Sequence, residues 1–399
     1  MVSQAIRVFG IFLSTSRIGV EPFATFASAL MLVGFCNMLR DLGQDPALLS
    51  LPKLNPRYVR FHFLITSALG ILACGVVSAL VWCSPWFTDL RPVFIFMPAL
   101  ILTEASYHTS QIVAQRRFAF RAIALIEVCA AISWLLMIVL VSFYHRTAAG
   151  LLLANLTDFL VRGTGLLLLE HACLRPVTIP RKVIRYFGRY ARILTVQSWI
   201  EHAGEHIDVA LLRLLSVPSE LGDYARVKQV SGIVFSLSVR LVDQVAAATY
   251  SAEQSSHGLL RRSVGRFLKL ALFGTLAALA GVCLIELTAR RDAPGVDTSL
   301  TGLWWWALPF CLIRPVLWNF NLSFKATSRP RLLLLSVSAN TLLLLVLALI
   351  FIPGLGARGL FLALIVSSLS TVALQWLWSA EFRGPQFSMR AVFPEQEGM

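Results

Sequence analysis

Apolar stretches long enough to cross a lipid bilayer recur along almost the whole chain. A helix needs about 20 predominantly apolar residues to cross the hydrocarbon core of a membrane. Only 14% of the residues are charged and 57% are hydrophobic, whereas soluble domains are about 25% charged. The chain is therefore predicted to be a multi-pass membrane protein.

The apolar stretches predict an all-α fold of about twelve transmembrane helices. The expected spans are 3–19, 22–39, 61–83, 92–115, 121–143, 149–171, 190–214, 221–249, 264–287, 301–325, 332–353 and 357–379. The first span is short and contains Arg7 and Arg17. We therefore expect either a start upstream of Met1 or a first helix that lies partly at the membrane interface.

Loops with many Lys and Arg residues alternate along the chain with loops that have few. Membrane proteins show this pattern because their cytoplasmic loops are enriched in these residues. The rich loops follow every second span and contain Arg40, Lys53, Arg57, Arg60, Arg116, Arg117, Arg121, Arg175, Arg181, Lys182, Arg185, Arg189, Arg192, Arg261, Arg262, Arg266, Lys269, Lys325, Arg329 and Arg331. The poor loops contain only Arg17, Arg91, Arg146, Arg290, Arg291 and Arg358. Since cytoplasmic loops are the basic ones, both termini are expected in the cytoplasm. The net charge of +14 then reflects topology and attraction to anionic membrane lipids, and nucleic acid is excluded as a partner.

The chain also contains a weak internal repeat, with matching features about 200 residues apart in the same order. The matched features are the Arg and Asp pairs that close spans 22–39 and 221–249, the Arg60-Phe61 and Arg266-Phe267 pairs, and the GLLLAN and GLFLAL segments at Gly150 and Gly359. An even number of helices in each repeat makes the two units parallel. We therefore predict two pseudo-symmetric six-helix bundles, residues 1–180 and 181–399.

Motifs for catalysis, cofactors or metals are missing from the sequence. The seven cysteines form no C-x-x-C pair and lie almost entirely in apolar stretches, which is typical of buried hydrophobic residues. There is no P-loop, no dinucleotide-binding fingerprint and no nucleophile–base constellation. We therefore predict a protein that is not an enzyme and that binds neither a cofactor nor a metal.

One face of span 190–214 contains Gln197, Glu201, Glu205 and Asp208 at helical spacing. Ionisable groups within a membrane usually face a cavity or a partner. One interpretation is that Glu201, Glu205 and Asp208 face a cavity and couple transport to an ion. The alternatives are structural ion pairs, or a helix start that still lies at the interface.

A second stripe, in span 301–325, consists of Arg314, Trp318, Asn321 and Lys325. A guanidinium deep in an apolar stretch suits a diphosphate, which it can meet with charge-assisted hydrogen bonds. Trp318 could stack on a sugar or on Arg314. The alternatives are that Lys325 extends to the interface and that Arg314 pairs with a helix carboxylate.

Two further polar stripes could bind sugar hydroxyls, for which amides and carboxylates are suitable partners. They are Glu104, His108 and Gln111 in span 92–115, and Asn155, Asp158 and Arg162 in span 149–171. The alternative is interhelical hydrogen bonding that only holds the bundle together. Asp158 and Arg162 could neutralise each other, and Glu127 is expected to pair locally with Arg121 or Arg117.

Charged residues also close two equivalent helices at the predicted cytoplasmic face. These are Arg40 with Asp41, and Arg240 with Asp243. Their repetition suggests a structural clasp that forms part of an inner gate.

Four stretches carry a family resemblance. They are GVEPFATFASALMLVGFCNMLRDLGQDPALLS at 19–50, AQRRFAFRAIALIEVCAA at 114–131, IRYFGRYARILTVQSWIEHAGEHIDVALLRLLSVPSELGDYARV at 184–227, and GARGLFLA at 356–363. In this order they resemble polysaccharide flippases of the Wzx type, within the multidrug/oligosaccharidyl-lipid/polysaccharide flippase superfamily. The resemblance spans essentially the whole chain, although the N-terminus is shorter than usual and the start of span 190–214 is unusually rich in His and Glu.

The resemblance implies a V-shaped pair of bundles around a central polar cavity, and alternating access to that cavity. It also implies that the cargo is an oligosaccharide linked to undecaprenyl diphosphate, moved across the bacterial inner membrane for polysaccharide export. A polysaccharide polymerase and the chain-length machinery are then expected as partners. The sugar, the coupling ion and the oligomeric state are left open.

Three other functions fit the sequence less well. A multidrug or cation exporter of the same superfamily needs an acidic residue in the first span, which offers Arg7 and Arg17 instead. A peptidoglycan-precursor flippase usually has additional helices. A membrane-embedded glycosyltransferase or polymerase presents catalytic residues on large outer loops, whereas the longest such loop here, around 288–300, is short.

Overall fold

The computed structural model describes residues 2–40, 48, 55–171, 177–253, 257–292, 299–326 and 330–381, and these residues contain no strand. The elements are α1 (Val2–Arg17), α2 (Val20–Arg40), α4 (Pro56–Cys83), η1 (Pro85–Val93), α5 (Phe96–Arg116), α6 (Phe120–Tyr144), α7 (Ala148–Leu169), α8 (Arg181–Leu215), α9 (Pro218–Ala252), α10 (His257–Asp292), α11 (Ser299–Ala326) and α12 (Pro330–Glu381). The predicted all-α fold is confirmed.

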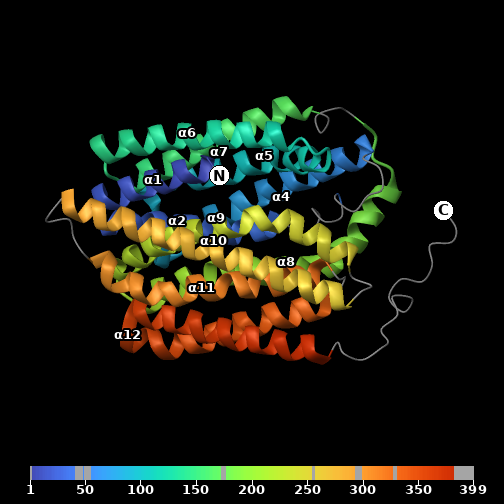
Figure 1. Cartoon of the computed structure of the whole chain (residues 1–399). Helices are drawn as coiled ribbons and strands as arrows, with labels where there is room; N and C mark the ends of the chain where they lie inside the picture. Colours follow the sequence, from blue (N-terminus) through green and yellow to red (C-terminus); the bar gives the residue numbers. More distant parts are fainter. Residues whose placement is uncertain are drawn as a thin grey trace.

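Each of the twelve predicted spans coincides with a helix or with one arm of α12. The last two spans form the two arms, which run antiparallel to each other (Figure 1). The arms join at Gly356, which has a φ of 55° and interrupts the helical dihedral angles. This left-handed conformation favours glycine, which has no Cβ to clash with the backbone.

Three helices begin well before the spans predicted from the sequence. Helix α4 begins at Pro56, α8 at Arg181 and α10 at His257, each in a basic stretch predicted to be a loop. The reason is that α8, with 35 residues, is about 52 Å long at 1.5 Å per residue. A helix of this length extends well beyond a hydrocarbon core of about 30 Å, so charge marks the end of the span but not the end of the helix.

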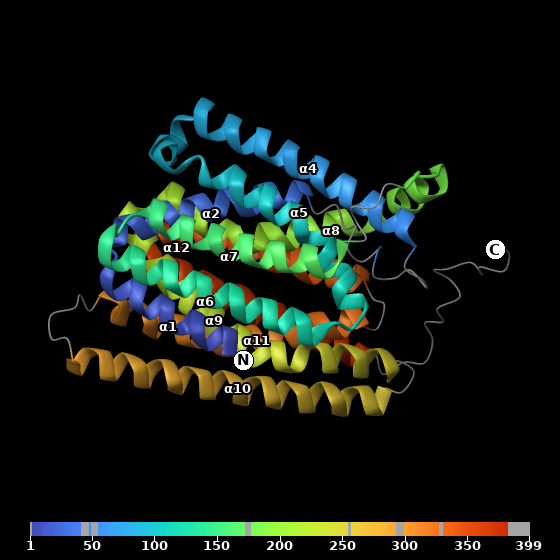
Figure 2. The same ribbon diagram turned by 90° about the horizontal axis from the view of Figure 1, so that it is seen from above.

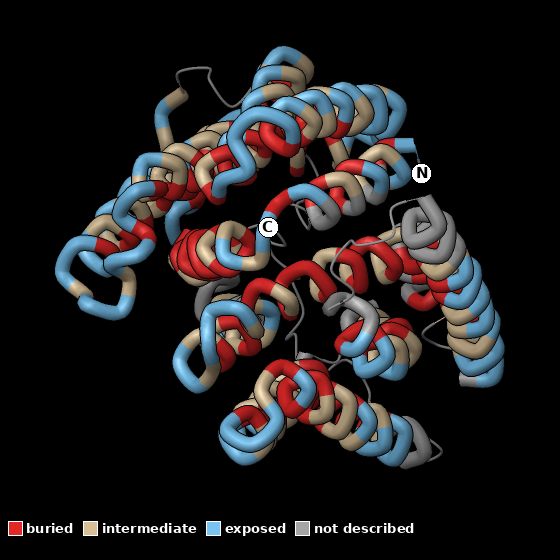
Figure 3. The backbone as a smooth tube through the Cα atoms, turned by 90° about the vertical axis from the view of Figure 1, so that its left-hand side faces the viewer, coloured by how far each residue is buried: buried red, intermediate tan, exposed pale blue. Residues whose placement is uncertain are grey.

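Six of the described helices are long and apolar enough to cross a membrane, or seven if η1 and α5, which are bent by 74°, count as one span. The helices that do not qualify include α8, α9 and α11, whose apolar stretches are interrupted by charged or polar residues. Exposed leucine, isoleucine and phenylalanine side chains cover the outward faces of α4, α6, α10 and α12. Figure 3 shows buried residues on the inward faces and exposed residues on the outside.

The same relative pairs of helices pack in both parts of the chain. Contacts of α2 with α4, α4 with α5, and α5 with α7 are matched by contacts of α9 with α10, α10 with α11, and α11 with α12. Helices α4 and α10 lie at opposite edges of the molecule (Figure 2). Helix α2 of the first part packs on α8 and α9 of the second. The division into residues 1–180 and 181–399 stays a prediction, and we call these two parts the first half and the second half.

Candidate functional site

A cavity of about 210 Å³ lies between α1, α2, α6 and α7 of the first half and α9 of the second. Its lining residues are Arg7, Ile11, Ser14, Phe26, Leu30, Trp134, Ile138, Leu151, Asn155, Gln229, Gly232 and Ile233. Most of the wall is apolar, with a few polar groups. Among the described residues, Arg7 is the one charged residue that lines it.

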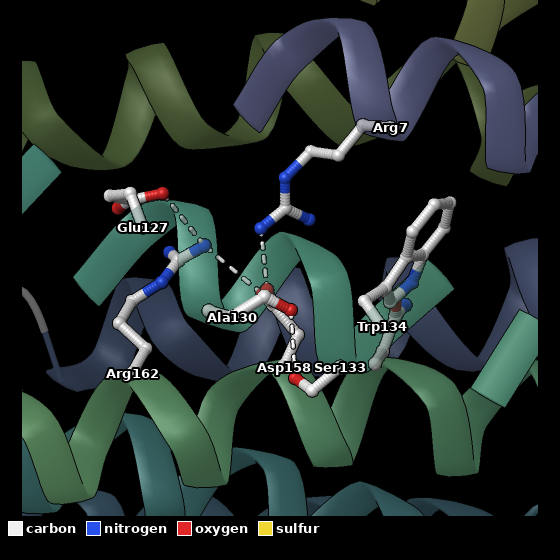
Figure 4. A network of polar contacts seen from close by, with 8 residues as sticks. Arg7, Glu127, Ala130, Ser133, Trp134, Asp158 and Arg162 are labelled. Atoms are coloured by element: carbon white, nitrogen blue, oxygen red, sulfur yellow. Dashed lines mark hydrogen bonds and ion pairs between the residues drawn. The ribbon is translucent and has the colours of Figure 1, made fainter. Parts of the chain in front are cut away.

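The Arg7 side chain is held in place by an ion pair and an aromatic ring (Figure 4). Its Nη2 donates a hydrogen bond to Oδ1 of Asp158 on α7 over 2.5 Å. Its guanidinium carbon lies 5.8 Å from the centre of the Trp134 ring on α6. Helix α1 begins part of the way along the bundle (Figures 1 and 2). The side chain of Arg7, which lies in this helix, is 18% exposed.

Asp158 has a second cationic partner one helical turn away. Nη2 of Arg162 lies 3.0 Å from Oδ2 of Asp158 and 3.3 Å from a carboxylate oxygen of Glu127 on α6. The Asp158 side chain is only 3% exposed. The two arginines and two carboxylates of this network, Arg7, Arg162, Asp158 and Glu127, balance in formal charge, which limits the cost of burying them.

This network corrects one sequence-based prediction. Glu127 was expected to pair with Arg121 or Arg117, its neighbours along the chain, but it pairs with Arg162 on the adjacent helix. Helices α6 and α7 are antiparallel neighbours joined by a short connection, so residues far apart in sequence lie at the same depth. The contact between Asp158 and Arg162, which the sequence left open as an alternative to sugar binding, is present.

Asn155 orients the aromatic part of the cavity wall. Its Oδ1 accepts a hydrogen bond from Nε1 of Trp134 over 3.0 Å. On the other side of the indole, Gly10 of α1 leaves room for the ring, since a Cβ at Gly10 would lie 2.4 Å from a ring carbon of Trp134. The indole is thus fixed between α1 and α7.

The stripe of Glu104, His108 and Gln111 on α5 does not line this cavity. Glu104 accepts hydrogen bonds from Asn37 and Arg40 of α2, each over 2.9 Å. The His108 ring lies 6.4 Å from the His62 ring of α4, and Gln111 is half-buried. The contacts of Glu104 and His108 join helices within the first half.

The predicted gate residues are described only in part. Arg40 is 6% exposed and bridges α2 to α5 through Glu104. Asp41 and the side chains of Arg240 and Asp243 lie outside the described residues. The gate therefore remains a prediction.

In the second half, Asp208 of α8 is surrounded by donors. It accepts hydrogen bonds from the Tyr224 hydroxyl, from Nζ of Lys228 over 2.8 Å and from the Val209 backbone N–H over 2.7 Å. The Glu205 side chain is exposed, and that of Glu201 lies outside the described residues. Of the three predicted ion-coupling residues, Asp208 is therefore the one whose side chain is described as buried. It forms an ion pair with Lys228.

The stripe on α11 does not reach the cavity either. The Arg314 guanidinium carbon lies 4.3 Å from the centre of the Phe235 ring of α9, and no ion pair of Arg314 is found among the described side chains. Trp318 packs on the cluster of Val242, Ala246 and Tyr250. Oδ1 of Asn321 accepts a hydrogen bond from Gln375 of α12 over 2.7 Å.

The sequence predicts a site role for Asn155, Asp158 and Arg162 but not for Arg7, Trp134 or Gln229. Arg7 had a usable signal, because a charge within an apolar stretch usually faces a cavity or a partner. Trp134 and Gln229 had none, since their position on the wall depends on how α6 and α9 pack against α1.

A helical bundle with apolar side chains on its outward faces, several helices long enough to cross a bilayer and a cavity between its two parts is the architecture of a multi-pass membrane protein. The chain belongs to the family described as "Polysaccharide biosynthesis protein", whose profile matches residues 18–289. No curated protein matches the chain.

Solved structures share the fold over nearly the whole chain. An inward-facing multidrug resistance MATE family transporter of the MOP superfamily aligns with a TM-score of 0.74 and 12% identity, covering 95% of this chain and 94% of that one. The lipid II flippase MurJ in an inward closed conformation aligns with a TM-score of 0.71 and 14% identity, covering 95% and 86%. An outward-facing MATE transporter aligns with a TM-score of 0.58 and 14% identity, covering 96% and 93%. The TM-scores show that the chain shares its fold with these three structures.

Proposed function

We propose that this protein is a flippase that moves an oligosaccharide linked to undecaprenyl diphosphate across the bacterial inner membrane for polysaccharide export. The observation that supports it is the cavity between the two halves, in which a guanidinium, an indole and two amides meet. The family match to polysaccharide biosynthesis proteins supports the same class of cargo.

The cavity wall offers complementary chemistry to a sugar diphosphate. The Arg7 guanidinium can donate charge-assisted hydrogen bonds to phosphate oxygens. The amides of Asn155 and Gln229 suit sugar hydroxyls, and the lipid tail would stay in the bilayer. Asp158 releases Arg7 at a moderate cost, because Arg162 continues to neutralise the carboxylate.

Transport would proceed by rocking of residues 1–180 against 181–399, which exposes the cavity to each side in turn. The higher TM-scores to the inward-facing and inward closed neighbours than to the outward-facing one support an inward state for this structure. In the proposed orientation both termini are cytoplasmic, and the polymerase and chain-length machinery act on the delivered product.

The stripes identified in the sequence keep a place in this proposal. Arg314, Trp318 and Asn321 on α11 would act from the second half, and Glu104, His108 and Gln111 from the first. Glu201, Glu205 and Asp208 are the candidates for ion coupling, although at Asp208 a coupling cation would compete with Lys228.

A deletion strain tests the function directly. Lipid-linked oligosaccharides are extracted, and the pools in the inner and outer leaflets are compared with the amount of surface polymer. Complete repeat units that accumulate in the inner leaflet, together with loss of surface polymer, are the expected result. Drug sensitivity without such accumulation would instead favour an exporter, and unpolymerised units in the outer leaflet would favour a polymerase or a polymerase partner.

A further inference from the structure

Two arginines of the second half contact the first half at the end of the bundle where α1 meets α2 and α8 meets α9. Arg213, near the end of α8, donates hydrogen bonds to Oδ1 of Asp89 over 2.6 Å and to the carbonyl oxygen of Trp86 over 2.8 Å. Both partners lie in η1. Arg213 also donates to the Ser28 hydroxyl of α2. One guanidinium thus joins α8 to two separate elements of the first half.

Arg226 of α9 makes a second connection at the same end. It is 5% exposed and donates a hydrogen bond to the carbonyl oxygen of Ile18, in the turn between α1 and α2. Its guanidinium carbon lies 5.1 Å from the centre of the Phe23 ring. This contact fixes α9 to the first turn of α2.

Gly222 brings the two backbones together between these arginines. A Cβ at Gly222 of α9 would lie 2.2 Å from the carbonyl oxygen of Val20 on α2. Because that atom belongs to the backbone, it cannot move aside as a flexible side chain could. The halves therefore touch directly here, and any larger residue would force them apart.

We propose that Arg213, Arg226 and Gly222 form a clasp that closes this end of the interface, and that release of the clasp opens the cavity to that side. In the orientation predicted from loop charge, this is the side away from the cytoplasm. The Asp89 and Arg213 side chains are 50% and 15% exposed, so water can replace their contacts when the clasp releases. A partly solvated ion pair is weak enough to break reversibly.

The clasp rests on the proposed alternating access, but it can be tested without cargo. A full-length chain with its seven cysteines replaced is given a single Ser14→Cys probe, because Ser14 lines the cavity. The probe is labelled in oriented vesicles by a membrane-impermeant thiol reagent supplied at the clasp side. We expect slow labelling in the parent and labelling about tenfold faster with Arg213→Gln, as expected from the loss of charge-assisted contacts.

Arg91→Gln is the matched control. Arg91 lies at the same end in η1, but it donates to the carbonyl oxygen of Trp82 over 3.2 Å, within the first half. Its replacement should leave the labelling rate at the parental value. Faster labelling with both variants to the same extent would overturn the clasp, because it would reflect general loosening.

Gly222→Ala opens the clasp by a different route. We expect it to accelerate labelling from the clasp side as well, whereas Gly265→Ala of α10, which has no atom within 4 Å of its Cβ position, should not. The exchanged pair Arg213→Asp with Asp89→Arg should bring the rate back towards that of the parent. Parental labelling rates in both Arg213→Gln and Gly222→Ala would overturn the proposal, and since no cargo is needed, that result would leave the flippase function untouched.

Discussion

The two halves of the molecule bury charge in different ways, although the same pairs of helices pack in each. In the first half, Arg7, Asp158, Arg162 and Glu127 form a chain of ion pairs that ends at a cavity wall. In the second half, Asp208 is enclosed by donors from α8 and α9. Among the described residues, the two parts thus share their pattern of helix packing, while the charge that lines the cavity, Arg7, comes from the first half.

From this comparison we predict that the charged group that binds the substrate comes from the first half, and that the buried charge of Asp208 in the second half is structural. Removing Arg7 should then affect export more than stability, whereas removing Asp208 should affect stability more than export. Arg314 is a cation of the second half and lies against Phe235. Its substitution tests whether a charge in the second half is also needed for export.

Replacement of Arg7 by Ala should have the largest effect. We expect export to fall by about 10- to 100-fold, since a charge-assisted hydrogen bond contributes about 1.5–3 kcal/mol. The measurement is surface polymer per amount of inserted protein. Arg17→Ala is the control, because this residue of the same helix is exposed and lies beside Phe143. Equal polymer yields from the two variants would remove Arg7 from the site.

Replacement of Asp158 by Asn should reduce stability most. It leaves Arg7 and Arg162 without their shared carboxylate, and breaking a buried ion pair costs about 3–5 kcal/mol. Thermal unfolding in detergent measures the loss. Glu127→Gln is the milder comparison, because this residue contacts only one of the two arginines and is 19% exposed. The network would be redundant if both variants unfolded at the parental temperature.

Asp208→Asn tests whether the buried carboxylate of the second half is structural. We expect a stability loss of about 1–3 kcal/mol, since hydrogen bonds to a charged group are weakened. Transport in vesicles should keep its dependence on the ion or proton gradient, because Lys228 already neutralises Asp208. Loss of gradient dependence would show that Asp208 couples an ion, as the sequence suggested.

Arg314→Ala should have the smallest effect of the four. The sequence alone predicts that this change abolishes export with normal insertion. Its aromatic contact in the structure leads us to expect a weaker result, since a cation–π contact contributes about 0.5–2 kcal/mol. The measurement is export by Arg314→Ala and by Phe235→Leu, and we expect the two variants to lose export to a similar extent. An Arg314→Ala phenotype as severe as that of Arg7→Ala would place Arg314 with the substrate.

The helices could be predicted because each depends on its own stretch of sequence. The twelve spans were found from local hydrophobicity, and the Asp158–Arg162 contact from helical spacing. The ion-pair partners of Glu127 and Glu104 could not be predicted from the sequence, because they lie on other helices. Which residues meet depends on the rotation and depth of each helix in the bundle. The polar side chains on α5 and α11 have the same helical spacing as those on α7, but they contact other helices and do not line the cavity.

The length of α8 has a mechanical consequence. A single continuous helix of 35 residues links contacts that lie near opposite ends of the bundle. Arg213 lies near one end of this helix, and Phe187, near the other, packs against Tyr58 and Phe61 of α4. If displacement of Arg213 from Asp89 shifts α8 as a whole, we expect the packing of Phe187 on α4 to change with it, so that one helix couples the two ends of the bundle.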